Sequence, residues 1–112
     1  MASSLPEIIS QHIVTGLEGT ELTAAERDLF RAFPPAGVIL FARNVESREQ
    51  LSKLSADVIE VIGKASGLVP LVMADHEGGR ISVLARAIGV PPTQMAVWKV
   101  FAETGDPELP AA

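Results

Sequence analysis

The residues best suited to chemistry form one continuous group, Asp75-His76-Glu77-Gly78-Gly79-Arg80. Asp75 and Glu77 are two positions apart, so in an extended backbone both carboxylates leave one side while His76 points to the other. The two glycines allow a sharp turn and the close approach of a ligand. Arg80 is suited to pair with a carboxylate or to bind a sugar hydroxyl. This segment therefore predicts a polar ligand site.

Other interpretations of this segment remain open to different degrees. A metal site is disfavoured, because consecutive side chains diverge and the only other histidine, His12, lies in a loosely specified N-terminal stretch. A phosphate loop is disfavoured because neither a Walker spacing nor G-x-G-x-x-G is present. A carboxylate pair for glycoside hydrolysis is geometrically conceivable, since retaining enzymes hold two carboxyls about 5 Å apart. The alternative without a ligand is a polar turn in which Arg80 pairs with Asp75 or Glu77.

Three short apolar runs each end where polar residues begin. Residues 13–17 lead to Glu18, residues 38–42 lead to Arg43 and Asn44, and residues 68–74 lead to Asp75. Continuous apolar runs are typical of strands covered on both faces in a parallel sheet. Ligands of such sheets bind at the carboxyl ends of the strands, so we expect the three polar groups to share one edge.

A helix is expected between the first two strands. Thr23 and Glu26 have the spacing of a capping box, and Pro34-Pro35 would end the helix because proline lacks the N–H and clashes with the preceding turn. We expect its buried stripe to consist of Leu29, Phe30 and Phe33.

A second helix is expected between the second and third strands. Ser47 and Gln50 indicate another capping box, and Gly63 is the expected left-handed stop. Apolar residues recur at helical spacing, namely Leu51, Leu54, Val58 and Ile62. After the third strand the sequence predicts a helical turn over 84–88, a break at 89–92 and a helix over 93–103 that carries Trp98 and Phe101.

The alternation of strands and helices predicts an α/β protein with a parallel sheet. A complete (β/α)8 TIM barrel needs about 250 residues, so 112 residues would supply about the first three βα units. Such a partial barrel cannot close. We therefore expect open sheet edges through which the chain self-associates.

Composition excludes several classes of partner. Nine Lys and Arg against fourteen Asp and Glu give a net charge of −5, so we expect no nucleic-acid or anionic-membrane partner. No apolar run approaches the roughly 20 residues of a membrane helix. The chain has no cysteine, hence no disulfide and no thiolate zinc site, and its first residues lack the features of a signal peptide. A cytoplasmic location is the expectation.

Three segments, 16–23, 37–44 and 74–80, resemble successive motifs of glycoside hydrolase family 3, most closely its bacterial β-N-acetylglucosaminidase branch. They follow one another in the family's order and spacing. The resemblance implies that residues 1–112 are the N-terminal portion of a catalytic TIM barrel. It also implies removal of terminal N-acetylglucosamine with retention, through a glycosyl-enzyme intermediate and without a metal or other cofactor.

The resemblance assigns roles to individual residues. Asp75 falls on the family's aspartate that hydrogen-bonds hydroxyls of the bound sugar, while Glu77 and Arg80 fall on motif positions that shape this loop. Arg43 and Asn44 match the end of the second strand, where they either buttress the barrel mouth or contact the sugar. Asp75, Glu77 and Arg80 are thus the expected substrate-binding residues, with Arg43, Asn44 and His76 in support.

The sequence also departs from the family pattern. His76 stands where glutamine is common, Val83 stands where the branch has a second sugar-binding arginine, and Gly16 stands where it often has an aspartate. Arg86 is the nearest substitute for the missing arginine.

The resemblance also implies which catalytic residues are missing. The family's aspartate nucleophile and its histidine-containing acid/base loop come from strands beyond Ala112, so no catalytic residue is expected here and the chain by itself is expected to be inactive. The alternative function is a non-catalytic sugar-binding or interaction module derived from the same barrel.

Overall fold

The first three strands form one parallel sheet in the order β1-β2-β3, within a computed structural model that describes residues 4–105. The strands are β1 (Val14–Thr15), β2 (Gly37–Leu40) and β3 (Leu71–Ala74). In register, Val38 lies opposite Thr15 of β1 and Val72 of β3. Helices connect the parallel strands, which confirms the predicted α/β class.

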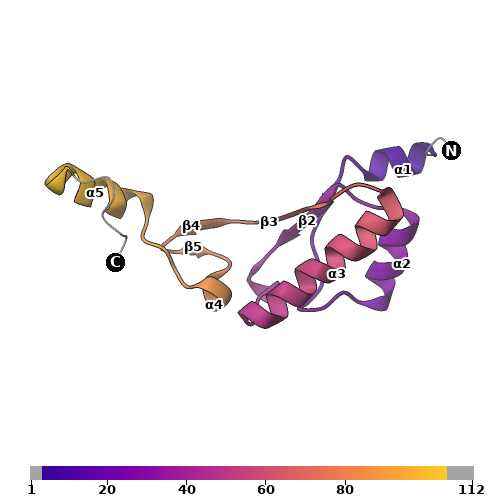
Figure 1. Ribbon diagram of the computed structural model, residues 1–112, viewed down its shortest axis with the longest axis horizontal. Coiled ribbons are helices and arrows are strands. Elements are labelled where there is room, and N and C mark those ends of the chain that lie inside the picture. The colour runs from indigo at the N-terminus through magenta and orange to yellow at the C-terminus, as the bar shows by residue number, and fades with distance from the viewer. Residues whose placement is uncertain (1–3, 106–112) are drawn as a thin grey trace.

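Helices α2 (Ala24–Ala32) and α3 (Arg48–Ser66) pack together on one side of this sheet (Figure 1). Thr23 caps α2 as predicted, because its hydroxyl accepts the Glu26 N–H at 3.1 Å and the Glu26 carboxylate accepts the Thr23 N–H at 2.8 Å. The buried core lies between these helices and the sheet. Its members are Leu17, Leu22, Phe30, Val38, Leu40, Leu54, Val58, Val61 and Ile62.

The predicted buried stripe of α2 is largely wrong. Phe30 is buried, but Leu29 is 55% exposed and Phe33 is 45% exposed. Adjacent helix positions point in different directions, so Leu29 cannot share the face of Phe30. Phe33 lies outside the stripe because it is the C-cap, where the backbone has already left the helical conformation at φ −137°.

Helix α3 is confirmed, with Leu54, Val58 and Ile62 buried and Leu51 half-buried, but its end is not where the sequence predicts it. The helix runs past Gly63 to Ser66, and Gly67 adopts the left-handed conformation at φ 72°. The second capping box is only half present. The Ser47 hydroxyl accepts the Gln50 N–H at 3.1 Å, whereas the Gln50 side chain bonds elsewhere.

Two elements were not predicted, helix α1 (Leu5–Ser10) and the antiparallel hairpin of β4 (His76–Gly78) and β5 (Ile81–Ser82). Ser4 and Glu7 form a capping box for α1, and the Ser10 hydroxyl donates to the Pro34 carbonyl at 3.0 Å. A short 3₁₀ helix, η1 (Ala42–Asn44), follows β2 and is also absent from the prediction. The elements α4 (Ala85–Ile88) and α5 (Gln94–Thr104) match the predicted turn and helix.

The molecule is elongated, with extents of 59 × 27 × 18 Å. Figure 1 shows α5 at the end farthest from α1, with the β4–β5 hairpin between α5 and the sheet. No residue of α5 is buried, and Trp98 is 67% exposed.

The expectation of strands covered on both faces is not met within residues 4–105. Alternation points Ile39 and Met73 away from the helices, and both are only half-buried, while Leu71 is 56% exposed. Within the same residues, no helix combines the length and the apolar character that crossing a membrane requires.

Candidate functional site

The polar residues that follow the three strands lie at one edge of the sheet. Leu40 pairs with Ala74, so Asp75 follows β3 beside Phe41, and η1 with Arg43 and Asn44 continues from there. The loop after β1 lies at the same edge, because both η1 side chains bond to its backbone. The carboxyl ends of the strands therefore bring the candidate groups together.

Asn44 ties the β1 loop to the end of β2. Its side chain is fully buried, and its Oδ1 accepts the Phe41 N–H at 2.9 Å. Its Nδ2 donates to the carbonyl of Leu17 at 3.1 Å and to that of Gly19 at 2.7 Å. One amide thus satisfies three backbone groups in a site with little access to water, which is a supporting role.

Arg43 makes contacts of the same kind from the surface. Its Nε donates to the Leu17 carbonyl at 3.0 Å, and its guanidinium carbon lies 4.9 Å from the centre of the Phe41 ring. A Cβ at Gly16 would lie 3.3 Å from Nη2 of Arg43. An aspartate in place of Gly16 would therefore contact Arg43 directly.

The segment after β3 folds back on itself. The Asp75 carbonyl accepts the Val83 N–H at 3.1 Å, and Gly78 and Gly79 make the turn with φ values of 87° and 60°. These are conformations that residues with a Cβ rarely adopt. A Cβ on Gly78 would also lie 2.5 Å from the carbonyl oxygen of Pro92, so the turn packs directly on the chain before α5.

The side chains of Asp75, Glu77 and Arg80 are exposed, and His76 is half-buried. No ion pair joins Arg80 to Asp75 or Glu77 in the described part of the chain. The structure therefore does not contain the pair that the alternative interpretation, a polar turn, requires. Residues 4–105 also contain no group of three or more His, Asp or Glu side chains placed to hold a metal ion.

An open groove of about 650 Å³ is lined by residues of β2, β3 and α3, and Asp75 is part of its lining. Apart from Asp75 and Ser55, its lining is apolar: Ile39, Leu40, Leu51, Val72, Met73, Ala74 and Leu84. An apolar cleft with a small number of polar groups is typical of small-molecule sites, in which the polar groups fix the orientation of the ligand. Asp75 supplies the charged hydrogen-bond acceptor of this groove.

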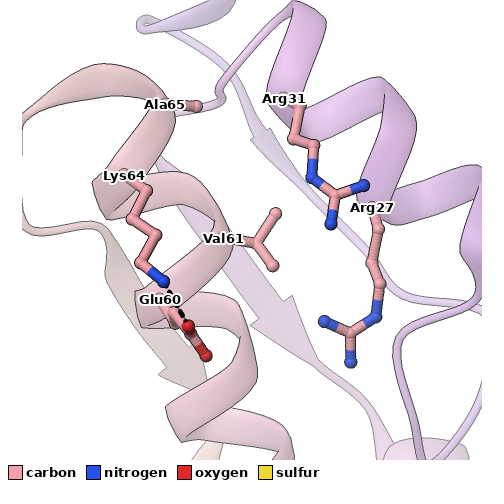
Figure 2. Close-up of a pocket in the computed structure, with 6 residues that line it drawn as sticks. All are labelled: Arg27, Arg31, Glu60, Val61, Lys64 and Ala65. Atoms are coloured by element: carbon pink, nitrogen blue, oxygen red, sulfur yellow. Dashed lines mark hydrogen bonds and ion pairs between the residues drawn. The ribbon is translucent and has the colours of Figure 1, made fainter.

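A second hollow of about 320 Å³ lies between α2 and α3, near the C-terminal end of α3 (Figure 2). Arg27, Arg31 and Lys64 line it, and each cation is paired with a carboxylate: Asp57 at 2.9 Å, Asp28 at 3.1 Å and Glu60 respectively. Because α3 ends just before β3 begins, this hollow lies at the opposite end of the sheet from Asp75. Of these three pairs, Arg27–Asp57 joins α2 to α3, and the other two lie within a single helix.

Contacts differ between Val83, which departs from the family pattern, and Arg86, the nearest substitute for the missing arginine. The Val83 amide bonds to Asp75 as described, and the Arg86 Nη1 donates to the Val45 carbonyl at 3.5 Å. Arg86 thus links α4 to the chain after η1.

Sequence reasoning missed two contributors to this edge. Gln50 donates to the carbonyls of Thr20 at 2.7 Å and Asn44 at 2.9 Å, and it accepts the Glu46 N–H at 2.8 Å. Its spacing from Ser47 suggested a local cap and so concealed this long-range role. Leu84 lines the groove beside Asp75, and no motif in the sequence marks it.

Comparison of sequences finds relatives among bacterial β-hexosaminidases. The β-hexosaminidase of Stenotrophomonas maltophilia strain K279a is 41% identical over 83 residues, 73% of this chain and 24% of the relative. That of Xanthomonas campestris pv. campestris strain B100 is 44% identical over 69 residues, 62% of this chain and 20% of the relative. The chain thus spans less than a quarter of the length of these relatives. No family model matches it.

Comparison of structures points the same way. A glycoside hydrolase family 3 β-N-acetylglucosaminidase from Paenibacillus sp. strain FPU-7 matches with a TM-score of 0.76 and 29% identity, covering 86% of this chain and 18% of that one. NagZ from Neisseria gonorrhoeae, in complex with N-trifluoroacetyl-D-glucosamine, shares the fold with a TM-score of 0.71 at 24% identity, covering 84% and 26%. These similarities confirm the predicted resemblance to β-hexosaminidases and family 3 β-N-acetylglucosaminidases.

Proposed function

We propose that residues 1–112 are the N-terminal portion of the (β/α)8 barrel of a retaining β-N-acetylhexosaminidase, about its first three βα units. The observation that carries the proposal is Asp75, an exposed carboxylate at the carboxyl end of β3 and in the lining of an apolar groove. The match to the Stenotrophomonas enzyme covers 73% of the chain. A match of that length includes Asp75 to Arg80, whichever residue of the chain it starts from.

In this proposal the substrate is a saccharide with a terminal N-acetylglucosamine. Asp75 accepts hydrogen bonds from hydroxyls of the sugar, which are charge-assisted and therefore stronger than bonds between neutral groups. Glu77 and Arg80 shape the same loop, while Arg43 and Asn44 support the edge by bonding to the Leu17 carbonyl. The reaction uses no cofactor, and its location is the cytoplasm.

A chimera tests this function. The segment of the Stenotrophomonas β-hexosaminidase that aligns with this chain would be replaced by residues of this chain, and kcat/KM measured with a chromogenic N-acetylglucosaminide. We expect turnover in the chimera and a loss of at least about 100-fold on Asp75→Asn, the scale of a lost charged contact to the transition state. The control is Asp28→Asn, an exposed carboxylate on α2. A folded, active chimera that Asp75→Asn leaves unchanged would refute the role of Asp75.

A non-catalytic sugar-binding module is the second candidate. It uses the same Asp75 groove and needs neither the nucleophile nor the acid/base group that the family resemblance implies. The chain alone is then expected to bind sugar without turning over a chromogenic substrate. Robust turnover by the chain, abolished by Asp75→Ala, would contradict both the module and the assignment of the nucleophile elsewhere.

Self-association is part of the same proposal. The outer edge of β3 pairs with no strand among residues 4–105, and Leu71 on that strand is exposed. Unpaired strand edges and exposed apolar surface favour association between chains. We expect copies of this chain to associate wherever no further strand covers that edge.

A further inference from the structure

His76 accepts a hydrogen bond from a backbone amide that helps to form the groove. Its Nδ1 receives the Leu84 N–H at 3.3 Å. A ring nitrogen that accepts a hydrogen bond carries no proton, so the neutral imidazole has its hydrogen on Nε2. The contact therefore fixes both the direction of the ring and its tautomer.

The neighbouring residue makes the matching contact. The Asp75 carbonyl accepts the Val83 N–H at 3.1 Å, so two consecutive residues, Asp75 and His76, hold two consecutive amides. The β4–β5 ladder begins at the pair His76 and Ser82. The Asp75–Val83 bond lies just outside this pair, and the His76 ring accepts the N–H of Leu84, which is two residues beyond Ser82 and precedes α4.

Each of these two hydrogen bonds involves a residue that lines the groove. Asp75 and Leu84 line the groove together, whereas His76 does not line it. Loss of the His76 contact would free Leu84 to move relative to Asp75. The groove wall beside the carboxylate is thus held by a residue that does not itself line the groove.

The other ring nitrogen has no such contact. Nε2 is buried and has no hydrogen-bond partner in the described part of the chain. A buried N–H without an acceptor lowers stability, so the contacts of Nε2 give no reason for a histidine at this position. The one bond that the ring makes is at Nδ1.

We propose that His76 is a positioning residue that holds the Leu84 wall of the groove against Asp75 by accepting the Leu84 N–H at Nδ1. The proposal rests on the proposed function, because it assigns His76 a role in the sugar site of Asp75. It treats His76 as a group that acts through Asp75 and Leu84 without touching the sugar.

A matched pair of variants tests it. Asparagine and leucine have the same side-chain skeleton, and the Oδ1 of asparagine can occupy the place of the His76 Nδ1 while leucine offers no acceptor. We expect His76→Leu to speed hydrogen exchange of the Leu84 amide and to weaken N-acetylglucosamine binding, each about fivefold, the equivalent of one hydrogen bond. We expect His76→Asn to stay within about twofold of the wild type in both measurements, because it keeps the acceptor.

The outcomes separate this proposal from the proposed function. Hydrogen exchange is measured on the sugar-free chain, so it tests the His76 contact even if the wild type binds no sugar, a result that would refute sugar binding by the chain and not the contact. Unchanged exchange and binding in His76→Leu would overturn the proposal. Equal losses in both variants would also overturn it, because the volume of the ring would then matter and its acceptor would not.

A measurement on the wild type needs no variant to fold. Nitrogen NMR of the imidazole at neutral pH should show Nδ1 in the range of an unprotonated nitrogen and Nε2 in that of a protonated one. A purely space-filling role for His76 would leave the tautomer free to exchange. A protonated Nδ1 in the folded chain would contradict the proposal.

Discussion

Asn44 is the residue on which the geometry of the candidate site depends most. It is fully buried, and its three hydrogen bonds hold the loop after β1 against the end of β2. The family resemblance implies that Asn44, at the end of the second strand, either buttresses the barrel mouth or contacts the sugar. The contacts of this one amide with backbone donors and acceptors can be identified only once the two strand ends are placed side by side.

Asn44→Ala is predicted to destabilise the chain by about 3 kcal/mol, because it leaves the Phe41 N–H and the Gly19 carbonyl without these partners and the Leu17 carbonyl with only its bond from Arg43. The free energy of unfolding from urea denaturation would measure this loss. The control is the neighbouring Arg43→Ala, whose exposed side chain makes one bond to the Leu17 carbonyl and should cost less than about 1 kcal/mol. Equal effects of the two variants would contradict the supporting role of Asn44.

At the scale of elements, two glycines near the end of α3 have different roles, which the sequence alone does not assign. Gly63 was the predicted stop, but it lies inside the helix, where a Cβ would lie 3.5 Å from the Leu68 carbonyl oxygen, an ordinary contact. Gly67 carries the left-handed conformation. Gly63 follows the buried Ile62, whereas Gly67 follows Ser66.

Gly63→Ala is predicted to raise the free energy of unfolding by about 0.5–1 kcal/mol, since alanine is the better helix former. Gly67→Ala is predicted to lower it by about 1 kcal/mol, because a Cβ opposes the left-handed conformation. Thermal or urea unfolding of the two variants would measure both. The assigned helix end would be wrong if Gly67→Ala were the more stable of the two.

The contact between α2 and α3 should depend on pH. The hydrogen bond from Lys53 lowers the pKa of Asp57, and the bond from Arg27 on the other helix lowers it further, although partial burial opposes both. A lowered pKa stabilises the fold above the ordinary value of 3.8, and this stabilisation is lost as the pH falls through the folded value.

Asp57→Asn is therefore predicted to reduce the free energy of unfolding at neutral pH and to flatten its decline below pH 3.8. Urea denaturation of the wild type and the variant from neutral to acidic pH would measure both effects. Curves that stay parallel through the acidic range would show that Asp57 carries no such linkage.

The elements that the sequence predicted have a strong apolar pattern. In β2 it is a continuous run, whereas α2 and α3 begin after a capping residue, such as Thr23, and α3 has apolar residues at helical spacing, such as Val58. The β4–β5 hairpin lacks such a pattern, because its strands are held by backbone pairing and by the packing of Gly78 on Pro92. Asp75 is predicted as a site residue because it directly follows an apolar run, and this role stays a prediction. The partners of His76 and Gln50 could not be predicted, because no sequence pattern links His76 to Leu84 or Gln50 to Thr20.

At the scale of the whole molecule, α5 carries apolar side chains that the fold does not bury. The helix buries no residue, and its exposed side chains include Met95, Trp98 and Phe101. Only some of the apolar residues of the sequence are therefore buried in the core. Exposed apolar surface of this kind is expected to be covered by another polypeptide.

The double variant Trp98→Ser with Phe101→Ser is predicted to reduce self-association while changing the free energy of unfolding by less than about 0.5 kcal/mol, because neither side chain is buried. Sedimentation of the wild type and the variant over a range of concentrations would measure the association. Lys99→Ser on the same helix is the control. A wild type that stays monomeric at every concentration would contradict the proposed self-association.

The most direct test of the sugar site is a titration of the 112-residue chain with N-acetylglucosamine, followed by the amide NMR shifts of residues 75–84. We expect saturable shifts at these amides in the wild type and in the Asp28→Asn control, and none in Asp75→Asn. An absence of shifts at high millimolar sugar, or equal shifts in Asp75→Asn, would contradict the claim that Asp75 in the lining of this groove binds the sugar.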